Sequence, residues 1–101
     1  MVTGNRKISW DKQATVQFRK AINYIREDSP QNADKVKKEI LEKINQLAQW
    51  PENNTPDKYK INNTGNYRAF ELHRYRISYL VKENEIIIAR IRHTGMAPKP
   101  Y

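Results

Sequence analysis

The chain has 101 residues and carries 19 lysines and arginines against 11 aspartates and glutamates, a formal net charge of +8. That length fits one domain over residues 1–101, and the absence of cysteine excludes disulfides and thiolate metal sites and favours a reducing cytoplasm. The sequence shows neither an apolar run long enough to cross a membrane nor a signal peptide, so no membrane association is expected. The net charge favours a polyanionic partner, either nucleic acid or a strongly acidic protein.

The first half of the sequence predicts a short strand followed by two helices. Residues 6–10 (RKISW) alternate as a strand does, and Asp11 can cap a helix over residues 12–27. Ser29 and the proline after it are typical of the start of a second helix, over residues 30–49. So short a connection makes the two helices antiparallel. Each helix has one apolar stripe, formed by Ala14, Phe18, Ala21, Ile22 and Ile25 in the first and by Ala33, Val36, Ile40, Ile44, Leu47 and Ala48 in the second.

After a polar loop over residues 51–65, the second half predicts three strands. The runs at 66–73 (NYRAFELH), 75–82 (YRISYLVK) and 85–93 (EIIIARIRH) change to a period of two and are joined by very short connections. Such connections are tight hairpins, so these strands are antiparallel. The expected fold is α+β in the order β-α-α-β-β-β, with the helix pair on one face of a three-stranded antiparallel sheet and the N-terminal strand added at one side.

Uncompensated positive charge is concentrated in this second half. Between Lys58 and Lys82 only Glu71 opposes six cations, and no acid follows Ile86. If the strand arginines share the face away from the helices, they form a concavity suited to phosphate, because guanidinium groups bind phosphate oxygens bidentately. The candidate RNA or phosphate ligands are Arg90, Arg92, Arg74, Lys58 and Lys60.

Four residues are candidates for cleaving RNA through its 2′-hydroxyl. Arg76 and Arg68, on neighbouring strands, would stabilise the phosphate, and His93 would act as the acid or base because imidazole titrates near neutral pH. Tyr101 would orient or stack on a base. No metal or cofactor is expected, since the sequence has no phosphate-binding glycine loop and its two histidines are far apart.

Less specific roles remain open for these residues. Arg68 can form a surface ion pair with Glu71 or Glu85, and His93 can be an ordinary surface histidine. The tail can be a disordered end, or Gly95 can turn it while Pro98 and Pro100 stiffen it.

The segments WDKQATVQFRKAINYI and YRAFELHRYRISYLVKENEIIIARIRH, with the closing tyrosine, resemble the RelE/ParE superfamily of toxins from bacterial type II toxin–antitoxin systems. The resemblance covers residues 7–101 and implies an acidic antitoxin as partner in a hetero-oligomer, bound through the helix hairpin and the basic sheet face. RelE-like members cut messenger RNA on the ribosome with basic residues on the concave sheet face. ParE-like members poison DNA gyrase and need no RNase site.

Carried over residue by residue, the resemblance places Arg76 on the middle-strand arginine of RelE-like members and Arg68 on a basic position of the preceding strand. Arg92 or His93 falls at the end of the last strand, and Tyr101 at the terminal tyrosine. The chain departs from RelE at Phe70, where a second lysine is expected, and Glu71 is the only evident acidic base. From the resemblance as a whole, we expect a metal-independent, ribosome-dependent mRNA endonuclease. A gyrase inhibitor and a non-catalytic basic binding module are the alternatives.

Overall fold

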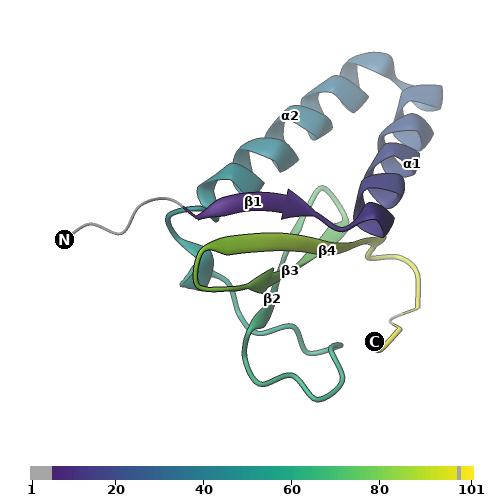
Figure 1. The fold of residues 1–101 in the computed structure, drawn as a ribbon. Coiled ribbons are helices and arrows are strands. Elements are labelled where there is room, and N and C mark those ends of the chain that lie inside the picture. The colour runs from purple at the N-terminus through teal and green to yellow at the C-terminus, as the bar shows by residue number, and fades with distance from the viewer. Residues whose placement is uncertain (1–5, 98) are drawn as a thin grey trace.

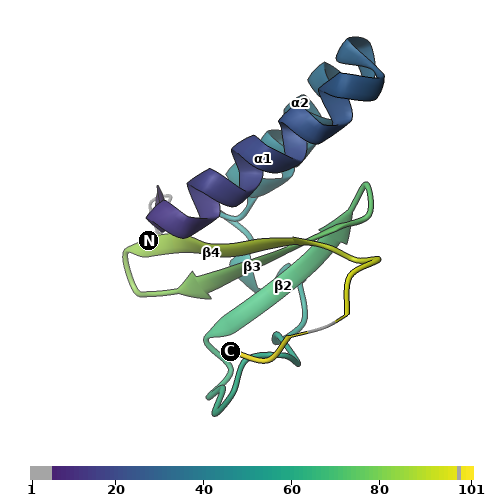
Figure 2. The same cartoon turned by 90° about the vertical axis from the view of Figure 1, so that its right-hand side faces the viewer.

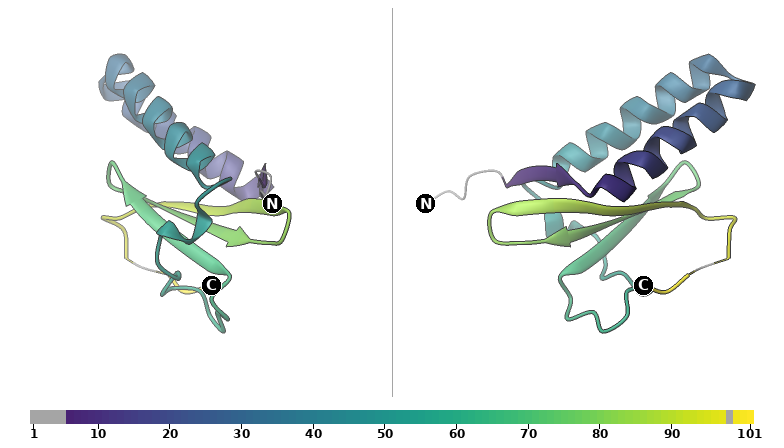
Figure 3. Two further views of the ribbon diagram at one scale, coloured as in Figure 1. Left: turned by 90° about the vertical axis from the view of Figure 1, so that its left-hand side faces the viewer. Right: turned by 45° about the vertical axis from the view of Figure 1, so that its right-hand side comes forward.

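The elements of the protein follow the predicted order in a computed structural model that describes residues 6–97 and 99–101 (Figure 1). They are strand β1 (Lys7–Trp10), helices α1 (Lys12–Asp28) and α2 (Pro30–Gln46), the short 3-10 helix η1 (Pro51–Asn53), and strands β2 (Tyr67–Leu72), β3 (Tyr75–Val81) and β4 (Glu85–His93). The α+β class is confirmed. The figures show the helix hairpin on one side of the sheet, and the loop before β2 and the C-terminal tail on the other (Figures 1 and 3).

The helices begin where the sequence predicts. The Asp11 carboxylate accepts the backbone N–H of Gln13 at 2.9 Å, and the Ser29 hydroxyl accepts that of Asn32 at 3.1 Å, so each side chain satisfies a donor that the first turn leaves unpaired. Ser29 also donates its backbone N–H to Ile25 at 2.9 Å, which closes α1 at the residue that opens α2. Helix α2 ends at Gln46, before the predicted end at residue 49, and the chain continues through residues 47–49 as a turn.

The sheet is mixed, in the order β1-β4-β3-β2. The two hairpins are antiparallel as predicted, whereas β1 pairs with β4 in parallel. That pairing joins residues far apart in the sequence, so local periodicity does not reveal it. In the β2–β3 hairpin, His73 and Arg74 take left-handed φ angles of 53° and 68°, which is the backbone that a tight two-residue turn requires and that glycine or asparagine usually supplies.

A bulge divides β4 into two registers. Ser78 pairs with Arg90 but Tyr79 pairs with Ile88, so Ala89 is the extra residue. Because side chains alternate along a strand, one inserted residue reverses the faces beyond it. The isoleucines on both sides of the bulge can therefore face the helices while Arg90 and Arg92 face the opposite way.

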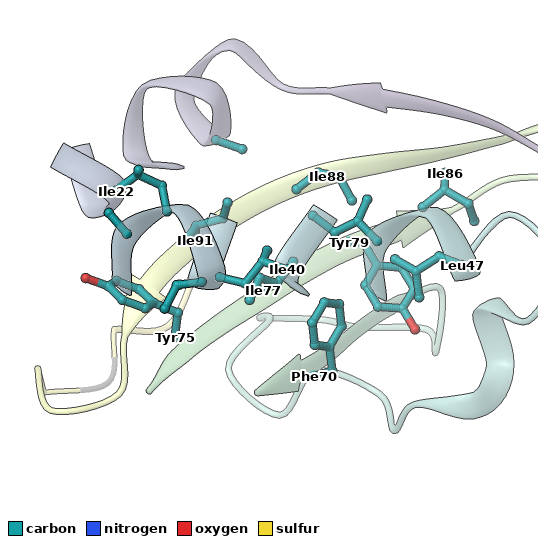
Figure 4. Packing of buried hydrophobic residues seen from close by; sticks show 14 residues of the cluster. Ile22, Ile40, Leu47, Phe70, Tyr75, Ile77, Tyr79, Ile86, Ile88 and Ile91 are labelled. Atoms are coloured by element: carbon teal, nitrogen blue, oxygen red, sulfur yellow. The ribbon is translucent and has the colours of Figure 1, made fainter. Parts of the chain in front are cut away.

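The core fills the space between the helix hairpin and the sheet (Figure 4). Ile77, Tyr79, Ile86 and Ile88 are fully buried from the strands, and Ile40 and Ile44 are almost fully buried from α2. The predicted helix stripes supply the rest, with Phe18, Ala21 and Ile25 of α1 partly buried against this cluster. Burying these side chains is the main favourable term holding the helices on the sheet.

The loop between η1 and β2 runs back along the outer edge of β2. Asp57 donates its backbone N–H to the carbonyl of Tyr67 at 2.8 Å, and Ala69 donates to that of Thr55 at 3.1 Å. The polar loop that the sequence predicts therefore pairs with the edge of the sheet and places Asp57 beside it. No helix in the described part of the chain has the length and apolar character needed to cross a membrane.

Candidate functional site

The sheet face away from the helices holds a cavity of about 60 Å³. Its lining comes from the β2-edge loop, the three C-terminal strands and the tail, and the loop and the tail lie near each other below the sheet in Figure 2. The cavity brings together three of the four predicted catalytic residues and two of the predicted phosphate ligands. They are Arg76, His93, Tyr101, Arg90 and Arg92.

Arg76 lies between two carboxylates. Its Nη2 donates to Asp57 Oδ1 at 3.0 Å and its Nη1 donates to Glu71 Oε2 at 3.0 Å. The guanidinium carbon lies 4.9 Å from the centre of the Tyr59 ring, and the side chain is 16% exposed. Its Nε is buried without a hydrogen-bond partner among the described residues. The charge of Arg76 is thus compensated inside the chain.

Asp57 is the buried acid at the centre of this arrangement, with a side chain that has no exposure. Its Oδ1 also accepts the backbone N–H of Tyr59 at 3.1 Å, and its Oδ2 accepts the Tyr101 hydroxyl at 2.5 Å. Burial acts to raise the pKa of Asp57, but the hydrogen bonds from Tyr101, the Tyr59 backbone and Arg76 outweigh it and lower the pKa below its ordinary value of 3.8. Asp57 is therefore an anion that the fold stabilises.

Tyr101 is fixed by its backbone as well as its hydroxyl. Its N–H donates to the Tyr59 carbonyl at 3.0 Å, and its own carbonyl accepts from Ile61 at 2.6 Å. Burial and the bond to Asp57 raise the pKa of Tyr101, so the phenol keeps its proton. The structure places Tyr101 against the loop and the sheet, whereas Pro98, which we expected to stiffen the tail, lies outside the described residues.

Arg90 and Arg92 form the part of the cavity without acidic partners. Neither makes an ion pair with any residue that the structure describes. The Arg90 guanidinium stacks on the Tyr101 ring at 4.4 Å. Burial lowers the pKa of Arg90 because it disfavours the charged form, and the nearby Arg92 lowers it further by repelling a second positive charge. These two arginines are the groups in the cavity best suited to an anion.

His93 lies at the margin of the cavity. It pairs across the sheet with Tyr75 and its ring meets the Tyr75 ring edge to face at 5.1 Å, so it leans toward the helix side. Its Nδ1 accepts the backbone N–H of Gly95 at 2.9 Å, which places the proton of the neutral ring on Nε2. A Cβ on Gly95 would lie 2.9 Å from the His93 ring, so a larger residue there would have to displace that ring.

Arg68 is separated from the cavity, so the expectation that it shares a face with Arg76 is wrong. Its cross-strand partner is Tyr79, a core residue on the helix side, whereas the partner of Arg76 is Glu71. Residues 68 and 71 are an odd number apart and lie on opposite faces. Arg68 donates instead to the Asn54 carbonyl at 2.6 Å, and forms neither of the ion pairs considered from sequence.

The remaining predicted ligands lie outside the cavity lining. Arg74 is exposed in the β2–β3 turn. Lys58 and Lys60 lie in the loop, where Lys60 contacts the rings of Tyr67 and Tyr101 at 4.8 and 5.3 Å. Lys60 therefore adjoins the site through Tyr101 and Lys58 adjoins it through the Tyr59 ring, whereas Arg74 does not adjoin it.

Sequence reasoning missed Asp57. It falls just before the cation-rich segment, and its neighbours give no sign that its carboxylate is buried. The one local signal is an acid two residues before Tyr59 in a turn-rich loop, which is the spacing at which an aspartate bonds the backbone N–H ahead of it.

The fold matches that of solved protein chains. The chain resembles a solved chain of the chromosomal ParDE toxin–antitoxin system from P. aeruginosa with a TM-score of 0.72 and 20% identity, covering 92% of this chain and 100% of that one. It resembles the YoeB dimer from Staphylococcus aureus with a TM-score of 0.51 and 22% identity, covering 88% and 97%. A sequence search of curated proteins returned no match. At these identities the likeness is one of fold, a helix hairpin packed on one face of a four-stranded sheet.

The particular family follows from the sequence. The family described as the ParE toxin of the type II toxin–antitoxin system parDE matches residues 8–98. The chain therefore belongs to the ParE toxin family. It is a toxin of a type II toxin–antitoxin system, and the partner class that goes with it is an antitoxin.

Proposed function

We propose that this toxin acts in the cytoplasm by poisoning DNA gyrase and that it does not cleave RNA. The observation that carries the proposal is the Asp57–Arg76 pair. An arginine that stabilises a scissile phosphate must offer free N–H donors to it. Arg76 directs one Nη at Asp57 and the other at Glu71, at 3.0 Å each.

The other candidate groups are engaged as well. The Tyr101 hydroxyl donates to the same carboxylate, and His93 Nδ1 accepts from Gly95. Arg68 lies on the opposite face of the sheet, and Phe70, at the position where RelE has a second lysine, is buried in the core. Arg76 and Tyr101 are thus bonded to one carboxylate, and Arg68 and Phe70 are directed away from the cavity. A ParE-like toxin needs none of them free.

An RNA-cleaving toxin is the second candidate, favoured by a separate observation. Arg90, Arg92 and His93 border one cavity, and the two arginines have no acidic partner among the described residues. If Arg92 took the role expected of Arg76, His93 Nε2–H would be the proton donor nearest to a bound phosphate. If the toxin cleaves RNA in this way, His93→Gln should abolish its toxicity.

Two readouts in one experiment distinguish these functions. The toxin is induced without its antitoxin, and plasmid supercoiling and mRNA 5′ ends on ribosomes are followed from the first minutes. Purified toxin is then added to gyrase and relaxed plasmid. We expect inhibited supercoiling or trapped cleaved DNA, with intact mRNA, and His93→Gln as toxic as the parent. Early mRNA cleavage that His93→Gln abolishes, with gyrase unaffected, would overturn the proposal.

Neutralisation by an acidic antitoxin is part of the proposal. A domain with a net charge of +8 attracts an acidic segment over long range and can then bury apolar surface against it. Co-expression of the neighbouring reading frame should restore growth, and the two chains should purify together as a hetero-oligomer. Growth arrest that no neighbouring frame relieves would contradict this.

A further inference from the structure

A set of cations around the cavity forms a surface that the proposed function leaves unexplained. We call it the basic face and define it by Lys58 and Lys60 of the loop, Arg90 and Arg92 of β4, and Lys99 of the tail. None of the five belongs to an ion pair formed within the described part of the chain. The two acids that line the cavity, Asp57 and Glu71, are both bonded to Arg76. The face therefore keeps its positive charge.

Three of the five cations of the basic face contact tyrosine rings. The Tyr101 ring has the Lys60 ammonium 5.3 Å from its centre and the Arg90 guanidinium 4.4 Å from it, so one ring joins a loop cation to a strand cation. Lys58 lies 5.2 Å from the Tyr59 ring. Contacts of this kind restrict long side chains before binding, which lowers the entropy cost of using them.

The chemistry of the basic face suits a polyanion better than a protein. Protein interfaces depend on apolar and aromatic anchors at their centre. Here the rings of Tyr59 and Tyr101 are already in contact with cations, and Met96 is the one exposed large apolar residue among the described residues that line the cavity. A groove beside α1, to which Ala21, Tyr24 and Ile91 contribute, adjoins the cavity and offers the apolar surface that a protein partner needs. The two share Arg92, His93 and Met96.

We propose that the basic face binds the phosphate backbone of duplex DNA. The inference rests on the proposed function, because it places the toxin against the DNA that gyrase holds. Duplex DNA presents one negative charge per about 1.7 Å of axis, so clustered cations can each meet a phosphate without reading sequence. The loop and tail that carry three of the cations lie on the side of the sheet opposite the helices, which leaves the helix hairpin free for another partner (Figures 2 and 3).

The test measures toxin affinity for a labelled duplex of about 25 base pairs by fluorescence anisotropy between about 50 and 200 mM salt. If about four phosphates are neutralised, the slope of log K against log salt is about −3.6, a loss of affinity of about 10²-fold over that range. The double variant Arg90→Gln/Arg92→Gln should make the slope shallower by about 2. The matched control Lys37→Gln/Lys38→Gln removes the same charge from the exposed face of α2 and should leave the slope nearly unchanged.

Each other outcome overturns part of the inference. Equal loss in both double variants would mean that only net charge matters and the basic face is no site. A single-stranded RNA of equal length that displaces the duplex would replace DNA by RNA as the partner. If the parent inhibits gyrase without salt-dependent DNA binding, the inference fails and the proposed function stands. If it binds DNA and leaves gyrase unaffected, the proposed function fails and the placement beside gyrase fails with it.

Discussion

Replacing Asp57 by asparagine tests whether the buried ion pair stabilises the fold. The variant keeps the size of the side chain but removes the charge from an acid with no exposure. Its bonds to Arg76 and Tyr101 are charge-assisted, worth about 1.5–3 kcal/mol each. In the variant the Tyr101 bond becomes neutral, worth about 0.5–1.5 kcal/mol, and the still-charged Arg76 loses its buried counter-ion. Arg76, 16% exposed, would then have only the half-exposed Glu71 as a counter-ion. We expect Asp57→Asn to lower the free energy of unfolding by about 2–4 kcal/mol.

Urea unfolding followed by circular dichroism measures this loss, and the melting temperature should fall by about 10–25 °C for a domain of this size. Glu71→Gln is the matched control, because it neutralises the other partner of the same arginine at an exposed position and should cost about 1 kcal/mol or less. Small and equal losses in the two variants would refute the reasoning. Arg76 would then be free for a phosphate, and the case against RNA cleavage would weaken.

The stability difference between the parent and Asp57→Asn should depend on pH. Because folding lowers the pKa of Asp57 from 3.8, its stabilisation is complete above that value and is lost as the pH falls through the lower, folded value. The difference in unfolding free energy between the parent and Asp57→Asn should therefore be constant from about pH 7 to pH 5 and shrink below about pH 4. An undiminished difference at about pH 3 would show that the ionised carboxylate is not its source.

Three further predictions concern single features. Tyr101→Phe removes the hydroxyl bonded to Asp57 but keeps the ring. The urea midpoint should therefore drop by the equivalent of about 1–2 kcal/mol. An unchanged midpoint would mean that this bond does not anchor the tail. Arg74→Gly relieves a left-handed φ of 68° in an exposed turn residue. The free energy of unfolding should rise by about 0.5–1 kcal/mol, which raises the melting temperature by a few degrees. A lower melting temperature would argue against backbone strain at this residue. Deleting Ala89 removes the bulge and reverses the faces of one part of β4. Near-UV circular dichroism should therefore show a loss of fixed side-chain packing. A deletion variant that melts like the parent would show that the strand tolerates either register.

The helices and the alternation of the strands were determined by the sequence alone. Asp11 and Ser29 cap the helices where their side chains predict, because capping needs only contacts two or three residues away. The helix stripes and the face of β3 that carries Ile77 and Tyr79 were also predictable, since burial repeats with the period of the backbone. The same local patterns, with the resemblance they carry, were enough to predict the superfamily.

The tertiary structure decided which of the predicted site residues meet. Asp57 lies 19 positions from Arg76 and 44 from Tyr101, and it reaches both only because the loop returns along β2. The bulge at Ala89 directs the β4 arginines to the cavity, and the register of β2 directs Arg68 away from it. Periodicity reports which side of its own strand a residue occupies. Periodicity carries no information on contacts between distant segments. A one-residue bulge also reverses the face that it predicts for every residue beyond the insertion.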